Sequence, residues 1–155
     1  MAKDRQAELA RKNLDKRLAP LDSVELARPR GGWVRAIRDA LGMSTRQLAS
    51  RMNVAHSRIA ALEKAETTGA TTLKSLREAA EALGCEFVYA FVPTKPLGIL
   101  VRDRARQKAH AQFASIAQGM LLENQSLTAA QKDEEIERLT DQILAEPIRR
   151  LWEDE

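Results

Sequence analysis

Apolar residues recur at helical spacing along most of this chain. Residues 3–18 predict an amphipathic helix, because small and apolar side chains share one side of a charged background: Ala7, Ala10, Leu14 and Leu18. Residues 19–32 predict a linker, since prolines and a pair of adjacent glycines interrupt the periodicity. Residues 1–32 are therefore expected to form an N-terminal helix and linker.

Four further helical signals lie within residues 33–84. The first ends at Gly42, a common helix stop. The second begins with a capping box, in which Ser44 is the N-cap residue and Gln47 bonds back to it. It ends at Asn53, a residue type that tolerates the left-handed conformation. The third and fourth helices carry their apolar positions at Val54, Ile59 and Leu62, and at Leu73, Leu76, Ala80 and Leu83.

The pattern changes beyond residue 84. Residues 85–92 are rich in β-branched and aromatic side chains and stop at Pro93, which predicts a short strand. A lone strand must pair with another, and the same strand of a second copy is the simplest partner. Residues 85–96 are therefore expected to form a strand and loop that could make a dimer contact.

Residues 97–155 predict a C-terminal helical region that could bind a partner. A long helix is expected over 97–124, with one apolar seam: Val101, Ala105, Ala109, Phe113, Ile116 and Met120. Thr128 and Gln131 form a second capping box, which opens an acidic helix that Pro147 ends or kinks.

Length and composition bound the function. A chain of 155 residues, 44% of them apolar, fits one small domain with helical extensions. No apolar run approaches the roughly 20 residues that a membrane helix needs, and the N-terminus has no apolar signal-peptide core. The single cysteine, Cys85, can form neither an internal disulfide nor a zinc site by itself. We therefore expect a cytoplasmic, nucleoid-associated protein that does not enter a membrane.

Charge is unevenly distributed along the chain. Residues 1–122 hold 21 Lys and Arg against 12 Asp and Glu, whereas residues 123–155 hold 4 against 10. A basic body favours a polyanionic partner such as nucleic acid. An acidic tail argues against uniform, non-specific binding.

The segment from Gly42 to Glu63 carries the functional signal. Two short helices are joined by a turn of about four residues, which is the helix-turn-helix arrangement. The segment resembles the Cro/Xre-type helix-turn-helix of phage repressors at seven positions: Gly42, Ser44, Leu48, Ala49, Val54, Ile59 and Glu63. With its flanking helices, the resemblance covers residues 33–84. It implies that the second helix of the pair enters the major groove of DNA.

Position within that motif predicts the DNA contacts. The resemblance places base contacts at His56, Ser57 and Ala61. It places phosphate contacts at Thr45, Arg46 and Lys64, because helix N-termini and cations suit phosphate. By its position, the third helix also presents Arg58 to the groove as a DNA-binding residue. The helix that would contact the bases has short side chains, so direct readout is expected to be sparse and indirect readout to contribute more of the specificity.

No residue constellation supports catalysis or metal binding. The sequence has no nucleophile paired with a base and an orienting group, and no glycine-rich phosphate loop. His110 has no second ligand four positions on, which disfavours a metal site. We expect a protein that is not an enzyme and needs no cofactor.

The whole chain also resembles a bacterial family called mobile mystery protein A. The resemblance rests on residues 30–43, 61–66, 87–93, 122–125 and 151–152. Members of that family are encoded beside a Fic-domain protein, which implies a toxin–antitoxin module with this chain as antitoxin and autoregulator. Glu123 and Asn124 match the Glu and Asn of Fic inhibitory helices, while Gly119 replaces the usual Ser or Thr.

These signals combine into one expectation with an open alternative. The fold class is all-α: a five-helix phage-repressor-like helix-turn-helix domain at 33–84, one short β-strand, and N- and C-terminal helical extensions. The function is sequence-specific DNA binding by a homodimer that represses transcription at an operator. The alternative is a protein inhibitor of a Fic-domain AMP-transferase toxin that acts through the Glu123 helix.

Overall fold

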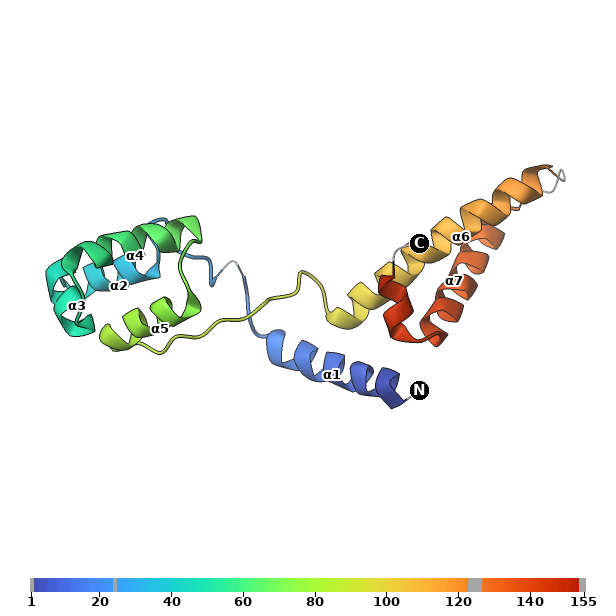
Figure 1. Cartoon of the computed structure of the whole chain (residues 1–155). Helices are drawn as coiled ribbons and strands as arrows, with labels where there is room; N and C mark the ends of the chain where they lie inside the picture. Colours follow the sequence, from blue (N-terminus) through green and yellow to red (C-terminus); the bar gives the residue numbers. More distant parts are fainter. Residues whose placement is uncertain (1, 24, 123–126, 154–155) are drawn as a thin grey trace. The chain divides into compact units, whose positions relative to one another are not determined.

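The computed structural model describes residues 2–23, 25–122 and 127–153, and every regular element in these ranges is helical (Figure 1). The predicted all-α class is confirmed over the described residues. The chain divides into two compact units. One spans Asp22–Phe91, and the other combines Met1–Leu21 with Val92–Glu155.

The Asp22–Phe91 unit contains four α-helices among its described residues, one fewer than the five-helix arrangement expected. They are α2 (Trp33–Ala40), α3 (Thr45–Met52), α4 (His56–Thr68) and α5 (Leu73–Ala82). No fifth helix follows α5, because aromatic side chains recur at every second position of the next residues, which have no apolar stripe at helical spacing.

A single apolar core holds these four helices together, and each of them contributes to it. Leu48 of α3 and Ile59 of α4 are fully buried at its centre. The other buried members are Val34, Ala49, Leu62, Ala79 and Leu83. Three of the predicted apolar positions, Ile59, Leu62 and Leu83, are among these buried residues. The prediction for the last helix is wrong in part, since Leu73 is 47% exposed and Ala79 is buried in place of Ala80.

The predicted helix ends are also confirmed. Ser44 Oγ accepts a hydrogen bond from the Gln47 backbone N–H (3.2 Å), and Gln47 Oε1 accepts one from the Ser44 N–H (2.7 Å). Asn53 ends α3 in the left-handed conformation with φ 54° and ψ 46°. These interactions are local, so the sequence alone was sufficient to predict them.

The predicted strand at residues 85–92 is wrong as a statement about the single chain. Residues 85–93 form neither helix nor strand, and no β-ladder exists among the described residues. A strand is defined by hydrogen bonds to a neighbour, and none of the described segments lies alongside this one to provide them. The β-propensity of these residues was therefore not sufficient to predict a strand, because no other described segment pairs with this one.

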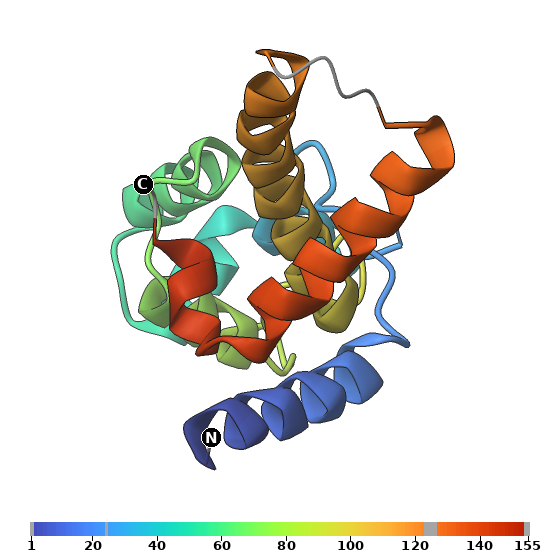
Figure 2. The same cartoon turned by 90° about the vertical axis from the view of Figure 1, so that its right-hand side faces the viewer.

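The second unit is built around two long helices. α6 (Leu97–Leu122) and α7 (Ala129–Ala145) pack along each other (Figure 2), and the 3₁₀ helix η1 (Ile148–Trp152) follows. Their shared core consists of Ala109, Phe113, Ile136 and Leu139. The long helix and the Thr128–Gln131 capping box are confirmed.

One detail of the predicted seam in α6 differs from the structure. Ile116 is 44% exposed, and Ala117 packs against the core in its place. Met120 belongs to α6 as predicted, but its side chain lies outside the described residues.

Helix α1 (Ala2–Leu18) attaches to this unit through carboxylates. Asp15 accepts hydrogen bonds from the backbone N–H groups of Leu97 (2.7 Å) and Gly98 (3.3 Å), and so caps the start of α6. Asp4 accepts one from the Ile148 N–H (3.0 Å) at the start of η1. Two of the four residues expected on the buried face of α1, Ala10 and Leu14, are exposed, so the predicted helix is right and its predicted packing face is wrong in part.

Candidate nucleic-acid interface

Helices α3 and α4 are joined by a tight turn that backbone hydrogen bonds close. The Val54 N–H donates to the Ala49 carbonyl (2.9 Å), which closes the end of α3 as the chain reverses. Ala49 is 3% exposed, and its small side chain lets the two helices approach closely. Leu48 and Ile59 are both 0% exposed and fix the angle between the helices. The result is one short helix held rigidly behind another whose outer side is free.

The outer side of α4 follows from its buried side. Ile59, Leu62 and Glu66 face the core. At roughly 100° per residue, the opposite side presents Ser57, Ala61 and Lys64, all of which are exposed.

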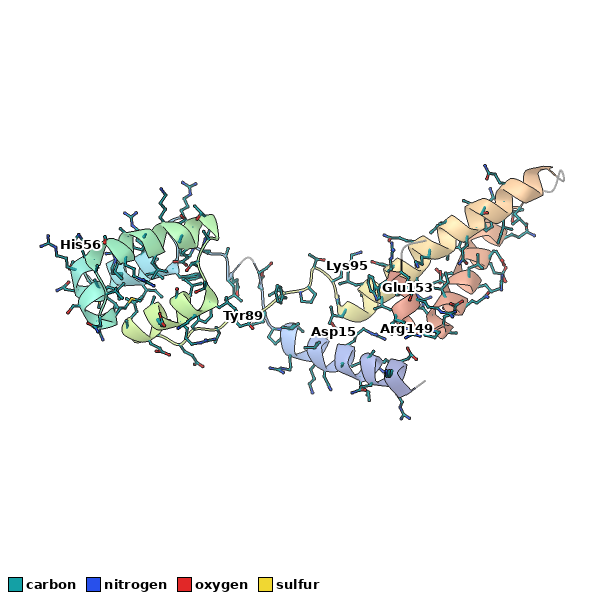
Figure 3. The ribbon with its side chains drawn as sticks, viewed as in Figure 1. Asp15, His56, Tyr89, Lys95, Arg149 and Glu153 are labelled. Carbon is teal, nitrogen blue, oxygen red and sulfur yellow. The ribbon has the colours of Figure 1, made fainter. Side chains whose placement is uncertain are left out.

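His56 begins α4, is exposed, and points away from the other helices of its unit (Figure 3). Ala55, the N-cap residue, supplies no side-chain acceptor to the first turn. Backbone N–H groups there stay available to solvent or to an anion.

The start of α3 provides a second group of exposed polar atoms. Arg46 is exposed and Thr45 is half-buried, directly after the Ser44 cap. The helix contains no acidic residue and carries Arg51 in its last turn. All seven predicted DNA-contact residues lie within the described ranges, and all except Thr45 are exposed.

Both acidic residues of the α3–α4 pair are turned inward. The first, Glu63, forms a bidentate ion pair with Arg38 of α2, with Nε–Oε1 at 2.6 Å and Nη2–Oε2 at 3.3 Å. The two side chains are 12% and 10% exposed. Hydrogen bonding to the Glu63 carboxylate raises the pKa of Arg38, so this buried cation stays charged.

The second acidic residue, Glu66, caps another helix. Its carboxylate accepts hydrogen bonds from the N–H groups of Trp33 (2.7 Å) and Val34 (3.1 Å), the first two residues of α2. Arg28 donates to the backbone carbonyl oxygens of Glu66 and Thr67 at the end of α4. Glu66 is 5% exposed, so its negative charge lies inside the domain and not on its surface.

The exposed side chains of the α3–α4 pair therefore carry positive charge alone. Four cations form no ion pair with any described residue: Arg46, Arg51, Arg58 and Lys64. An unpaired set of cations around a protruding helix is the electrostatic footprint of a phosphate-binding surface.

Arg58 lies at the flank of this surface. It lines a cleft of about 540 Å³ between α4 and α5, together with Arg51. Glu78 and Glu81 of α5 line the same cleft. Arg58 is thus about 60° around the helix from Ala61, on the side nearer α5.

Sequence reasoning missed Arg51 as a member of the cationic set. Its signal was available, since no Asp or Glu lies within four positions of it. The other predicted features give less. Glu123 and Asn124 lie outside the described residues. Within the described ranges, no group of three or more His, Cys, Asp or Glu side chains could hold a metal ion, and no helix is long and apolar enough to cross a membrane.

Comparison with known proteins gives one match. Residues 34–89 match the family model described as Helix-turn-helix. The match contains α2 to α5 and the motif predicted from the sequence. No curated protein and no solved structure matches the chain. Over residues 34–89 the chain is therefore similar to a DNA-binding, regulatory family, and the match does not extend to the whole-chain resemblance noted from the sequence.

Proposed function

We propose that this protein is a sequence-specific transcriptional repressor that binds operator DNA as a homodimer. The observation that carries the proposal is the sorting of charge on α3 and α4. Both carboxylates point inward to partners on α2, while the four cations that form no ion pair with a described residue, two on each helix, are exposed. A helix-turn-helix with that distribution is suited to the major groove.

In the proposed complex, α4 lies in the major groove and the start of α3 contacts the DNA backbone. His56, Ser57 and Ala61 face base edges, and Ala61 can contact only a thymine methyl group. Thr45, Arg46 and Lys64 contact phosphates and set the register of the domain on the duplex. Two such domains would span half-sites about one helical turn, or roughly 10 bp, apart, or a multiple of that distance.

Fluorescence anisotropy tests this function directly. The full chain is titrated against its own upstream DNA and against a scrambled duplex at several salt concentrations. Specific operators are bound at roughly 10⁻⁸–10⁻¹¹ M, against about 10⁻⁴–10⁻⁶ M for non-specific DNA. A gap of that order is expected. Equal and weak binding to both duplexes would remove the chain's own promoter as the target.

A matched pair of lysine variants tests the interface. Lys64→Ala, on the outer side of α4, should weaken binding to all sequences and lower the salt slope by about 0.9, the value for one lost phosphate contact. Lys74→Ala, on the exposed surface of α5, should leave both unchanged. The same loss in both variants would mean that general charge, and not this surface, governs binding. Arg58→Ala is less informative, because Arg58 lines the α4–α5 cleft beside two glutamates.

The alternative, an antitoxin that inhibits a Fic-domain toxin, rests on the sequence resemblance. Glu123 and Asn124, which would carry the inhibition, lie outside the described residues, so no contact in the structure bears on it. Co-expression with a neighbouring Fic-domain protein discriminates the two functions. If the Glu123→Gly variant neutralises the toxin as well as the unaltered chain does, inhibition through this carboxylate is excluded.

A further inference from the structure

The segment that follows α5 is extended, apolar and without hydrogen-bond partners. Val88 is 77% exposed, Tyr89 64% and Phe91 87%, and the figure for Phe91 is the highest among the exposed large apolar residues of the described chain. No backbone N–H or C=O group from Glu86 to Phe91 forms a hydrogen bond with another described residue. A β-type sequence that displays both its backbone and its aromatic side chains is an unpaired edge.

The beginning of this segment is fastened to the helix-turn-helix unit. The Cys85 N–H donates to the Ala80 carbonyl (2.8 Å), and the Cys85 side chain packs against the core. The Arg77 guanidinium lies 5.9 Å from the centre of the Phe87 ring. A partner that pairs with this segment is therefore coupled to α5 and to the position of its domain.

The aromatic side chains alternate along the segment. Phe87, Tyr89 and Phe91 are two residues apart, so they share one face of an extended chain. The Phe87 and Tyr89 rings are stacked at 6.3 Å with an interplanar angle of 25°. Tyr89 lies on the extended chain beyond α5 (Figure 3). The spacing and the ring stacking are those expected when the aromatic side chains lie on one face of an extended chain.

We propose that this segment pairs with the same segment of a second copy, as an antiparallel two-stranded ribbon with Tyr89 on the twofold axis. In that register Tyr89 lies opposite Tyr89 of the partner subunit, and Phe87 lies opposite Phe91 of the partner subunit. Every aromatic residue then has an aromatic partner across the strands, an arrangement that stabilises antiparallel pairs.

Neighbouring registers are less favourable. An axis at Val88 places Phe91 opposite Cys85 of the partner subunit, and the backbone N–H of Cys85 is already bonded to α5. An axis at Ala90 places Phe87 opposite Pro93 of the partner subunit, which has no N–H to donate. The symmetry of the aromatic positions about Tyr89 favours a second copy over an unrelated strand as the partner.

The area available sets the strength of this dimer. Aromatic side chains bury about 150–250 Å² each, so Tyr89 and Phe91 of two copies supply on the order of 600 Å². Stable interfaces bury about 1,200–2,000 Å². The ribbon alone therefore gives a weak dimer that forms at raised protein concentration. DNA carrying two half-sites would strengthen the dimer; this last expectation rests on the proposed function.

Disulfide trapping without DNA tests the register. In a Cys85→Ala background, Tyr89→Cys should cross-link two copies under mild oxidation, since opposite residues have Cβ atoms about 4.5–5.5 Å apart. Phe91→Cys is the matched control: two copies of residue 91 lie four positions apart along the ribbon, roughly 14 Å, which a disulfide cannot span. Phe87→Cys mixed with Phe91→Cys should cross-link.

The expected result is at least about tenfold more cross-linked dimer for Tyr89→Cys than for Phe91→Cys. Equal cross-linking of the two would overturn the antiparallel register. Absence of cross-linking, together with a monomer by sedimentation at about 100 μM for the unaltered chain, would overturn the ribbon itself. Tyr89→Asp should also lower the sedimentation-detected dimer while leaving the helical circular dichroism unchanged. None of these readouts contains DNA, so loss of DNA binding does not affect them.

Discussion

At the scale of single residues, buried charge decides what the helix-turn-helix surface presents. Glu66 is far from α2 in sequence, yet its carboxylate caps that helix, and Gly32 makes the approach feasible. Gly32 has φ +84°, and a Cβ there would lie 2.6 Å from Glu66 Oε2. The same inward turn removes a negative charge from the neighbourhood of the proposed phosphate contacts.

The Glu66 cap makes a stability prediction. Glu66→Ala should lower the free energy of unfolding by roughly 2–3 kcal/mol, because hydrogen bonds to a charged group contribute about 1.5–3 kcal/mol, and the buried N–H of Val34 and the part-buried N–H of Trp33 lose their acceptor. Urea denaturation measures the loss. Glu66→Gln, which keeps one acceptor oxygen, is the control. Its free energy of unfolding should lie between that of the unaltered chain and that of Glu66→Ala. An Ala variant as stable as the unaltered chain would mean that water replaces the carboxylate at no cost.

At the scale of elements, α1 shows how a charged helix can dock with little apolar burial. Its two half-buried carboxylates accept hydrogen bonds from backbone N–H groups at the starts of α6 and η1. The N–H groups in the first turn of a helix have no acceptor within the helix itself. The macrodipole of α6 favours a negative charge at that end as well. The attachment of α1 therefore rests largely on hydrogen bonds that its carboxylates accept from backbone N–H groups.

Acid should loosen this attachment. The hydrogen bond from the Ile148 backbone N–H lowers the pKa of Asp4 below its usual value. The unfolded chain then binds the proton more readily than the folded chain, so stability from Asp4 is present above the unfolded pKa of about 3.9 and is lost as the pH falls through the folded value. Asp4→Asn, which does not titrate, should show a smaller loss of α1 protection in hydrogen exchange between about pH 5 and pH 3. Identical pH profiles would assign the acid sensitivity elsewhere.

At the scale of the whole molecule, the charge asymmetry along the sequence is partly cancelled in space. The acidic residues of α7 pair with cations of α6: Arg102 lies 2.8 Å from Glu137 and 3.5 Å from Asp141, and Arg106 lies 3.6 Å from Glu137. Part of the acidic tail thus neutralises its own unit. The cations of α3 and α4 in the helix-turn-helix unit form no ion pair with a described residue, which is the charge distribution that the proposed function requires.

The two-unit organisation predicts that the DNA-binding part is separable. Every member of its core lies between Val34 and Cys85, so a fragment of residues 22–91 should fold without the rest of the chain. Circular dichroism should show a cooperative thermal transition, and the fragment should bind a single half-site within about threefold of the full chain's affinity. A fragment that remains unfolded would show that the second unit is required for its stability.

The helix-turn-helix could be predicted from the order of residues, because its signals are short-range. The Ser44–Gln47 box, the left-handed Asn53 and the spacing of Leu48 and Ile59 all act within a few turns. The directions of the charged side chains, in contrast, depend on contacts between distant parts of the chain. Glu66 accepts a hydrogen bond from Trp33, 33 positions away in sequence, and Asp4 accepts one from Ile148, 144 positions away. No local sequence pattern predicts such pairs. The strand prediction was wrong for a related reason. β-propensity is a property of residues 85–92, whereas a β-ladder requires a second strand, which no described part of one chain supplies.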